Sequence, residues 1–350
     1  MNLFKSKMTT DSLEFVILAA GRGTRNYPHS KGIPHKSLVP FGSQKVIDYL
    51  VKDIIAAGAK HITIVCSDES AKKAFQACFT HEKDVEDKFE RKGNTLELEL
   101  LKSLYLPENI DLKFVIQKQA LGTGHAIGLV HNSISDKHRN IVMLWGDDIV
   151  LPDYIVNEYK TAPKTILTRA VERYLSDGYG GNLIATRKVK DPSRWGIVEN
   201  GVYIEKPKKS KSNEAAFCFA IFDYKVTEKL GIDAKLIDEG KEPVYKDGFV
   251  GGEYIFIPAL NATVLEDKHK QHLRTVKMKS DEIYLDCGSL AGYEKALIYS
   301  LLTSSAYAKE NLMFIIKLYL RRKQFYKSPF KLLKSIFKSF INLKKIVRRS

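Results

Sequence analysis

The sequence predicts an α/β protein with a mixed, mostly parallel central sheet and helices on both of its faces. Short apolar runs alternate with helix-like segments through the first 150 residues. Three of these runs end in glycine or polar residues, as expected at the carboxyl edge of a parallel sheet. Both observations are typical of a Rossmann-like fold, in which ligands bind beyond that edge.

Each expected element has a local signal in the sequence. Apolar, β-branched runs bounded by polar residues predict strands, and apolar residues at three- or four-residue spacing predict helices. In the first half the strand-like runs are Phe15–Ala20, His61–Cys66, Leu112–Gln117 and Ile141–Leu144. The helix-like segments there are Val46–Ala57, residues 68–104 with a helix pair around Gly93-Asn94, and residues 122–131. The second half contains strand-like runs at Thr165–Arg169, Gly181–Thr186, Gly196–Ile204, Ala215–Phe222 and Tyr284–Asp286, then a helix from Gly288 to about Thr303.

A glycine-rich loop follows the first strand, with the sequence Ala-Ala-Gly-Arg-Gly-Thr-Arg over residues 19–25. Glycine lets backbone N–H groups approach a polyphosphate closely, and Arg22, Arg25 and Lys36 supply positive charge. The loop is not a dinucleotide fingerprint, because Asn26 stands where a third glycine is needed. It is not a P-loop either, because no Gly-Lys-Ser/Thr follows. Two interpretations remain: an ordinary turn, or a phosphate-binding loop of a third kind.

The composition is that of a globular protein. At 350 residues, with 44% hydrophobic and 28% charged residues, the chain can form one large domain or two ordinary ones. No apolar stretch reaches 18 residues, and the N-terminus lacks the features of a signal peptide. The four cysteines have no Cys-x-x-Cys spacing, which favours reduced thiols over a disulfide framework or a zinc site. We therefore expect a cytoplasmic protein.

The net charge of +15 is concentrated at one end of the chain. From residue 309 onward there are 13 basic side chains and one acidic side chain, so this segment carries +12. The preceding residues carry only +3, which argues against a nucleic-acid-binding body. The asymmetry predicts an appended interaction element, and we place the domain boundary between residues 1–305 and 306–350.

Eight short motifs resemble, in order and spacing, those of the bacterial UTP–glucose-1-phosphate uridylyltransferases, within the sugar-nucleotide pyrophosphorylases. They lie within about residues 14–300 and comprise Leu18–Arg25, Ile33-Pro34 with Lys36, Gln117 with Leu121–His125, Asp147, Ser193–Gly196, Glu205–Pro207, Gly252-Glu253, and Asp286–Gly288 leading to Gly292-Tyr293. The resemblance implies a Mg²⁺-dependent enzyme with a fold of the nucleotide-diphospho-sugar transferase type. In such an enzyme a phosphate oxygen of a sugar 1-phosphate attacks the α-phosphorus of a nucleoside triphosphate and expels pyrophosphate.

The resemblance also assigns roles around the phosphates. Arg25 and Lys36 would be catalytic cations on the triphosphate, and Asp147 and Asp286 would hold one Mg²⁺. The rest of the triphosphate loop would be Ala20, Gly21, Gly23 and Thr24. We prefer Asp147 to Asp148 as the ligand because it directly follows Gly146, although either carboxylate could instead cap a turn.

Base and sugar recognition is assigned in the same way. Gln117 would read the pyrimidine edge through hydrogen bonds, and Gly122 would let the base lie against the backbone. Lys206 would bind the phosphate of the sugar 1-phosphate, and Glu205 and Glu253 would accept hydrogen bonds from sugar hydroxyls. Gly196 would allow close approach of the sugar ring. Two alternatives remain open: Glu253 as a helix N-terminal carboxylate, and His125 as a structural rather than catalytic residue.

Three positions depart from the family pattern. His35 is an additional residue between Pro34 and Lys36. Trp195 stands where the family usually has Tyr or Phe, and an apolar Phe256-Ile257-Pro258 follows the motif around Glu253. The last two departures bear on the identity of the sugar more than on the reaction.

The basic tail lies beyond the resemblance. In residues 330–349 the apolar side chains of Leu333, Ile336, Phe337, Phe340, Leu343 and Val347 fall on one helical face, and lysines and Arg349 on the other. A cationic amphipathic helix of this kind suits an anionic membrane surface, here the inner face of the membrane. Packing on the body or a second subunit, and nucleic-acid binding, are alternatives. Pro329 is expected to separate two helical pieces.

The expected function is uridylyl transfer from UTP to glucose 1-phosphate in a homo-oligomeric enzyme. Thymidylyl or cytidylyl transfer to another sugar phosphate is the nearest alternative. A metal-dependent glycosyltransferase at a membrane surface is a second one, and a non-catalytic binding subunit a third. The triphosphate loop argues against the glycosyltransferase, because such an enzyme uses a nucleotide diphosphate sugar.

Overall fold

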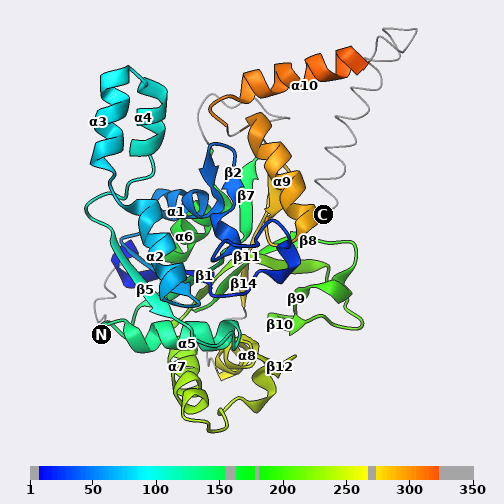
Figure 1. The fold of residues 1–350 in the computed structure, drawn as a ribbon. Helices are drawn as coiled ribbons and strands as arrows, with labels where there is room; N and C mark the ends of the chain where they lie inside the picture. Colours follow the sequence, from blue (N-terminus) through cyan, green and yellow to red (C-terminus); the bar gives the residue numbers. More distant parts are fainter. Residues whose placement is uncertain (1–7, 154–162, 178–180, 267–272, 304, 323–350) are drawn as a thin grey trace. The chain divides into compact units, whose positions relative to one another are not determined.

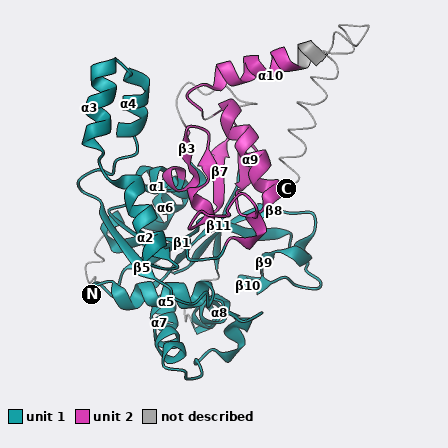
Figure 2. Cartoon of the chain, in the orientation of Figure 1, with its two compact units in different colours: residues 1–22, 50–146, 164–279 teal, residues 23–49, 147–163, 280–350 magenta. Residues whose placement is uncertain are grey.

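The computed structural model describes residues 8–153, 163–177, 181–266, 273–303 and 305–322 (Figure 1). Two compact units divide the chain (Figure 2). Unit 1 comprises residues 1–22, 50–146 and 164–279, and unit 2 comprises residues 23–49, 147–163 and 280–350. Helix α1 (Val46–Ala56) runs along the sequence from unit 2 into unit 1. The predicted division into residues 1–305 and 306–350 is untested by these units and stays a prediction.

Unit 1 contains a nine-stranded mixed sheet with the order β10-β9-β11-β6-β1-β4-β5, and β8 pairs with β11 and β14. Its strands are β1 (Leu13–Ala19), β4 (His61–Cys66), β5 (Asp111–Ile116), β6 (Asn140–Trp145), β8 (Leu183–Lys188), β9 (Gly196–Glu199), β10 (Val202–Glu205), β11 (Glu214–Phe222) and β14 (Arg274–Lys277). Strands β1, β4, β5 and β6 are parallel, as their apolar runs predict. Strand β11 is antiparallel to β6, so the later strands extend the sheet as expected.

The helices between the parallel strands follow the predicted order. They are α2 (Glu69–Phe79), α3 (Lys83–Lys92), α4 (Thr95–Lys102) and α5 (Thr123–Ser133). The segment 68–104 therefore forms three helices, and the pair predicted around Gly93-Asn94 is α3 and α4, which lie side by side (Figure 1). Gly93 ends α3 in the left-handed region and turns the chain back.

The second half required two corrections. Thr165–Arg169 is not a strand: helix α6 (Ile166–Asp177) begins there, and the Thr165 hydroxyl accepts a hydrogen bond from the Thr168 amide at 3.2 Å. The buried residues of α6 recur at helical spacing, which outweighs the β-branched start of the segment. Residues 196–204 are not one strand but the β9–β10 hairpin, with Asn200 and Gly201 at positive φ in its turn.

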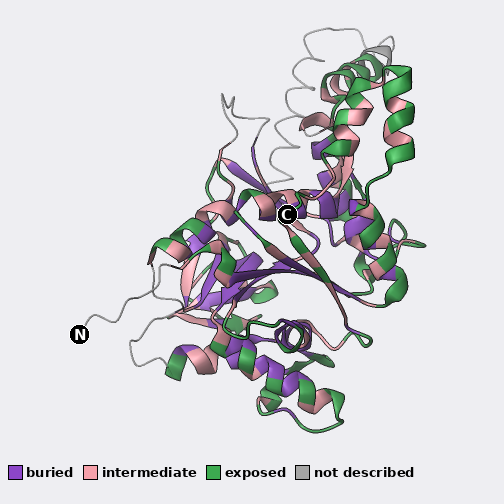
Figure 3. Cartoon of the chain, turned by 90° about the vertical axis from the view of Figure 1, so that its left-hand side faces the viewer, coloured by how far each residue is buried: buried purple, intermediate pink, exposed green. Residues whose placement is uncertain are grey.

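The core of unit 1 lies between one face of the sheet and helices α5, α7 (Tyr224–Asp238) and α8 (Ile257–Glu266). Val16 and Val65 of the sheet, Val130 of α5 and Leu230 of α7 belong to this cluster. Figure 3 shows the central strands almost continuously buried, and Figure 1 shows α2 and α6 on the other face of the sheet. The α/β class with helices on both faces is confirmed.

Helices α5 and α7 approach each other closely at Gly128. A Cβ at this position would lie 2.2 Å from the Leu230 carbonyl oxygen and 2.6 Å from the Ala234 Cβ. Beside this contact, the Asn132 side-chain amide donates a hydrogen bond to the Gly231 carbonyl at 2.9 Å. The two helices therefore form a tightly packed pair.

Unit 2 is built around a short antiparallel pair, β7 (Asp148–Pro152) and β15 (Glu282–Asp286). Its other described elements are the 3-10 turns η2 (Thr24–Asn26) and η3 (Lys36–Leu38), the hairpin β2 (Pro40–Phe41) and β3 (Gln44–Lys45), and helices α9 (Leu290–Thr303) and α10 (Ala308–Arg322). Helix α9 is tied to both strand pairs, because Tyr293 donates to the Pro40 carbonyl at 2.9 Å and Tyr299 to the Pro152 carbonyl at 3.2 Å.

Helix α10 forms the described part of the predicted tail. It exposes the apolar side chains of Met313, Phe314, Ile315 and Leu318. The helix predicted over 330–349 and the break predicted at Pro329 lie outside the described residues. Among the residues that are described, none of the helices has the length and apolar character needed to cross a membrane.

We predict that Gly128→Ala destabilises the protein by about 1–3 kcal/mol, because the methyl group overpacks the α5–α7 contact although alanine is the better helix former. The measurement is urea unfolding followed by circular dichroism. Gly21→Ala is the control, since a Cβ there meets nothing within 4 Å. Equal stability of the two variants would contradict the packing argument.

Candidate functional site

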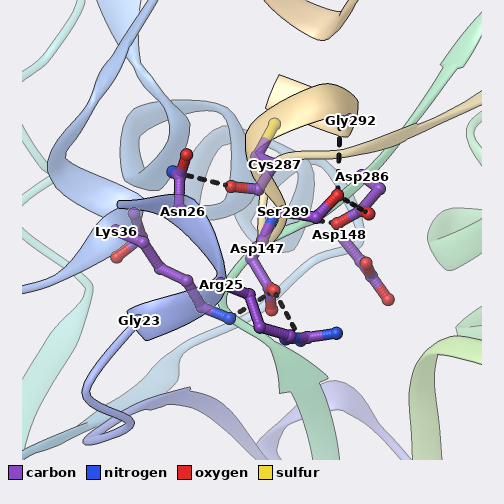
Figure 4. Close-up of polar contacts among 12 residues, drawn as sticks. Gly23, Arg25, Asn26, Lys36, Asp147, Asp148, Asp286, Cys287, Ser289 and Gly292 are labelled. Atoms are coloured by element: carbon purple, nitrogen blue, oxygen red, sulfur yellow. Dashed lines mark hydrogen bonds and ion pairs between the residues drawn. The ribbon is translucent and has the colours of Figure 1, made fainter. Parts of the chain in front are cut away.

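Three carboxylates meet in unit 2 where β7 and β15 pair (Figure 4). The antiparallel register places Asp286 opposite Asp148, and Asp147 directly precedes β7. Each of the three offers one oxygen atom, and these atoms all lie within 4.8 Å of one another. Hard oxygen ligands at this spacing can hold a divalent cation such as Mg²⁺.

Two cations meet the Asp147 carboxylate (Figure 4). Lys36 Nζ donates a short hydrogen bond to Asp147 Oδ2, and Arg25 lies 3.9 Å from the same oxygen. The lysine side chain is 12% exposed, whereas that of Arg25 is 73% exposed. Lys36 is thus largely enclosed in its contact with Asp147, whereas most of the Arg25 side chain is open to solvent.

The loop that carries both cations is anchored to the end of β15. The buried Asn26 donates from its side-chain amide to the Cys287 carbonyl at 3.2 Å, and Ser30 donates to the Gly23 carbonyl at 3.1 Å. Cys287 also donates from its backbone N–H to the Asp147 carbonyl at 2.8 Å. These contacts connect the segment after Gly23 to the residues around the carboxylates.

His35, the additional residue before Lys36, has a structural role. It is buried, and its Nδ1 accepts a hydrogen bond from the Ser37 amide at 3.1 Å, which caps the turn η3. Burial, aided by the nearby charge of Lys36, lowers the pKa of His35 from 6.5 to about 3. The departure from the family pattern therefore fixes the turn on which Lys36 stands.

Asp286 and Gly288 shape the other side of the cluster. Asp286 accepts hydrogen bonds from the Gly288 amide at 2.8 Å and from the Ser289 hydroxyl at 2.6 Å, so it caps the turn into α9. A Cβ at Gly288 would lie 1.7 Å from Asp147 Oδ2, so a side chain here would displace that carboxylate. Burial and, after it, the charges of the three aspartates raise the pKa of the Cys287 thiol.

In unit 1, the predicted base-reading residues lie in contact. The Gln117 side-chain nitrogen donates to the Gly122 carbonyl at 3.0 Å and lies 3.1 Å from His125 Nδ1. His125 is buried at the start of α5, and its Nε2 lies 3.0 Å from an oxygen of Asp238. These contacts support the structural role expected for His125.

The position of Gly122 in the fold has no space for a side chain. Its φ is +93°, and a Cβ would lie 2.6 Å from the Tyr254 carbonyl oxygen and 2.9 Å from the Glu253 Cβ. Glu253 therefore lies beside Gly122, as an exposed residue of the hairpin β12 (Phe249–Val250) and β13 (Glu253–Tyr254). The interpretation of Glu253 as a helix N-terminal carboxylate is wrong. Glu253 is the first residue of strand β13, and the next helix, α8, begins only at Ile257.

Two of the predicted sugar-phosphate residues, Glu205 and Lys206, lie at the end of β10. Lys206 Nζ is 3.4 Å from Glu205, its side chain is exposed, and its φ of +42° is unusual for a residue other than glycine. The Lys206 amide donates to the Trp195 carbonyl at 3.0 Å. The indole of Trp195 stacks under Arg187 at 4.6 Å.

The space that a Gly196 side chain would need is filled by the Tyr203 hydroxyl group, 1.9 Å from the Cβ position.

Ala20 and Gly21 follow β1 in unit 1, while Gly23 and Thr24 belong to unit 2, so the predicted triphosphate loop continues from one unit into the other along the sequence. The structure thus brings together Arg25, Lys36, Asp147 and Asp286 in unit 2. It also brings together Gln117, Gly122 and Glu253, and Glu205 with Lys206, in unit 1.

Residues 14–290 match the nucleotidyl transferase family. This match covers well over half of the chain. The chain belongs to the nucleotidyl transferase family.

The similar proteins within this family include uridylyltransferases. The chain is 30% identical over 265 residues to the UTP–glucose-1-phosphate uridylyltransferase 2 of Staphylococcus saprophyticus, covering 68% of this chain and 85% of that protein. It is 34% identical over 158 residues to the uridylyltransferase 1 of the same organism, covering 43% of this chain and 52% of that protein. Over these shorter matches the chain spans about half the length of its relatives, 51% for the Bacillus subtilis uridylyltransferase. The resemblance to bacterial UTP–glucose-1-phosphate uridylyltransferases is confirmed.

Solved structures confirm the fold of this nucleotidyl transferase. The UDP-glucose pyrophosphorylase of Acinetobacter baumannii superposes with a TM-score of 0.68 at 22% identity, over 87% of this chain and 99% of that one. A UTP-bound enzyme from the same organism gives a TM-score of 0.67, also at 22% identity. At this identity the likeness concerns the fold alone.

Sequence reasoning missed several residues of this nucleotidyl transferase. It set Asp148 aside, yet the pairing of β7 with β15 brings Asp148 as close to the cluster as its neighbours. It did not single out Asp238, which contacts His125. Asp148 could have been found from the acidic pair that precedes an apolar strand. No local signal marks Asp238, because its contact depends on how α5 and α7 pack.

We predict that His35 makes the unfolding free energy depend on pH. The folded protein resists protonation of His35 down to about pH 3, whereas the unfolded chain takes up the proton near pH 6.5. The stabilisation that the neutral, buried His35 contributes is therefore complete above pH 6.5. As the pH falls from 6.5 toward 3, the free energy of unfolding decreases by up to about 1.4 kcal/mol per pH unit. His35→Asn retains a capping acceptor but does not titrate.

The measurement is the urea unfolding free energy of both proteins between pH 7 and pH 5. The wild type should lose more stability than His35→Asn over this interval. Parallel pH profiles would show that His35 is not held neutral by burial.

Proposed function

We propose that the protein transfers the uridylyl group of UTP to glucose 1-phosphate, forming UDP-glucose and releasing pyrophosphate. The observation that carries the proposal is the meeting of Lys36 and Arg25 on the Asp147 carboxylate, beside Asp148 and Asp286. Two cations with a set of oxygen ligands suit a reaction on phosphates. The uridylyltransferase relative that matches along 85% of its length supports the choice of nucleotide and sugar.

The cations would act on the charge that the reaction redistributes. In nucleotidyl transfer negative charge builds on the leaving pyrophosphate and on the oxygens around the α-phosphorus, so positioned positive groups lower the barrier. Lys36, held by η3, would stay close to the reacting phosphate. Arg25, which is largely exposed, would bind the leaving pyrophosphate. The attacking phosphate oxygen is already ionised, so the reaction needs no general base.

The carboxylates would hold the Mg²⁺ that this class of reaction uses. Asp147 and Asp286 are the proposed ligands, and Asp148 lies within reach of the same ion. The donor set fits, because Asp147 Oδ1 accepts no hydrogen bond from any described residue. When bound, the ion would neutralise phosphate charge and orient the triphosphate.

Residues of unit 1 would recognise the base and the sugar. Gln117 would hydrogen-bond to the pyrimidine edge, and the backbone of Gly122 would border the base. Glu253 and Glu205 would accept hydrogen bonds from sugar hydroxyls, and Lys206 would bind the phosphate of the sugar 1-phosphate. The contact of Gln117 with Gly122 and the position of Glu253 beside Gly122 support these assignments.

The decisive experiment measures pyrophosphate release with UTP, dTTP and CTP, each paired with glucose 1-phosphate and with other sugar 1-phosphates, in the presence of Mg²⁺. UTP with glucose 1-phosphate should give the highest kcat/KM. A preference for dTTP or CTP would select the alternative transferase. Absence of turnover with every pair would reject the enzyme proposal.

We predict that Asp147→Asn lowers kcat at least about 100-fold, because it removes a ligand charge and the partner of Lys36. Added Mg²⁺ should restore part of the loss, and chelation by EDTA should abolish wild-type activity. Glu294→Gln is the matched control, since Glu294 is an exposed carboxylate of α9 in the same unit. Full activity of Asp147→Asn would remove Asp147 from the metal site.

We further propose that the basic tail contacts an anionic membrane surface. The exposed apolar side chains of α10 and the 13 basic side chains from residue 309 onward support this interpretation. Self-association through the same helix is the competing interpretation, and it would make the protein a homo-oligomer.

Vesicle flotation separates membrane binding from self-association. The full chain and a chain ending at residue 308 are each floated with phosphatidylglycerol vesicles and with phosphatidylcholine vesicles. The full chain should float with the anionic vesicles alone, and the shortened chain with neither. Equal flotation of both chains would refute membrane binding. Light scattering of the two proteins reports whether the tail holds subunits together.

A further inference from the structure

The hydrogen bonds of Gln117 define which way its amide group points. Its Nε2 position lies 3.0 Å from the Gly122 carbonyl oxygen, and a backbone carbonyl can only accept a hydrogen bond. This atom is therefore the amide NH₂ group and not the amide oxygen. The assignment rests on the chemistry of the partner, which removes the usual ambiguity between the two ends of a glutamine.

The same amide defines the state of His125. Gln117 Nε2 also lies 3.1 Å from His125 Nδ1, so this ring nitrogen accepts a hydrogen bond and carries no proton. The ring proton then sits on Nε2, which lies 3.0 Å from Asp238 Oδ1. A carboxylate accepts and does not donate, so Asp238 favours this tautomer. The three side chains thus form one consistent series of hydrogen bonds.

This arrangement uses both hydrogens of the Gln117 amide. The carbonyl oxygen Oε1 has no hydrogen-bond partner among the described residues. Gln117 is 5% exposed, so its amide is largely enclosed by the protein. Its side chain consequently offers a ligand one hydrogen-bond acceptor and no donor.

We propose that Asp238 and His125 are positioning residues for base selection: they orient Gln117 so that it accepts a hydrogen bond from the nucleotide base and rejects a base that presents a lone pair there. This inference rests on the proposed nucleotidyl transfer. On the hydrogen-bonding edge of uracil the N3–H group is the one donor, and it would meet the Gln117 oxygen. Cytosine in the same pose has a lone pair at N3, and two acceptors would face each other.

The helices that carry these residues pack closely against each other. His125 belongs to α5 and Asp238 ends α7, and the two helices pack closely at Gly128. Their pairing is reinforced by Asn132 with Gly231 at 2.9 Å and by His131 with Thr227 at 3.1 Å. The Asp238 side chain is 52% exposed, so the packing of α7 does not depend on burying it. A closely packed support favours a precise choice between two similar bases.

The first test is independent of turnover. Nitrogen-15 NMR of the histidine-labelled protein should show His125, identified by the signal missing in His125→Phe, as the Nε2–H tautomer. Asp238→Asn should raise the population of the Nδ1–H tautomer, because an amide can also donate to Nε2. Glu239→Gln, which neutralises the next carboxylate, should not change it. An Nδ1–H tautomer in the wild type, or an unchanged tautomer in Asp238→Asn, would overturn the proposal.

The second test measures base selection. The ratio of kcat/KM for UTP to that for CTP should fall about tenfold or more in Asp238→Asn and His125→Phe, and not in Glu239→Gln. The kcat with saturating UTP should change little, because Gln117 does not touch the reacting phosphates. Wild-type protein should also discriminate against 3-methyluridine triphosphate, which lacks N3–H. Equal losses for UTP and CTP would indicate a merely structural role and overturn the proposal.

A failure of the proposed function is distinguishable from a failure of this inference. If no nucleotide is turned over, calorimetric binding of UTP and CTP replaces kinetics, with the same expected change in their ratio. Binding of both nucleotides with equal affinity to the wild type, or of neither, would overturn the inference. The thermal unfolding midpoints of all variants show whether each remains folded.

Discussion

The antiparallel pairing of β7 with β15 is the constraint on which the candidate phosphate site depends. Its register sets Asp148 opposite Asp286 and leaves Asp147 at the start of β7. Three carboxylates so close together repel one another, and this arrangement is tolerable only with compensating positive charge. Lys36 and Arg25 supply that charge, and Asn26 ties their loop to the backbone just after Asp286. The charges of the candidate site are therefore also part of the ion-pair and hydrogen-bond contacts within unit 2.

In unit 1, too, a predicted ligand-binding residue takes part in the fold: the predicted base reader is also a structural residue. Gln117 closes the turn before α5 through Gly122, and His125 connects it to α7 through Asp238. Residues that serve both the fold and the ligand are costly to vary, because a change in either role affects the other. The departures from the family pattern fall elsewhere. His35 is buried and caps the turn η3, and the guanidinium group of Arg187 lies over the Trp195 ring.

Sequence reasoning succeeded where the signal was local. The parallel strands and the helix pair around Gly93 follow from short-range patterns. It failed at Thr165–Arg169, where β-branched residues suggested a strand but the apolar spacing beyond them continues as a helix. It also read 196–204 as one strand, because the turn at Asn200-Gly201 lies within an otherwise strand-like run. At Thr165–Arg169 the longer-range pattern outweighed the local preference, whereas at Asn200-Gly201 a local turn signal was overlooked.

The sequence alone determined the α/β class, the family and most of the residue types that the chemistry needs, because these depend on periodicity and on short motifs. The tertiary structure decided which of those residues meet. It added Asp148 to the carboxylate cluster, gave His35 and His125 their partners, and brought in Asp238 from a helix far along the chain. Such contacts depend on strand register and helix packing between distant segments, and neither leaves a local trace in the sequence.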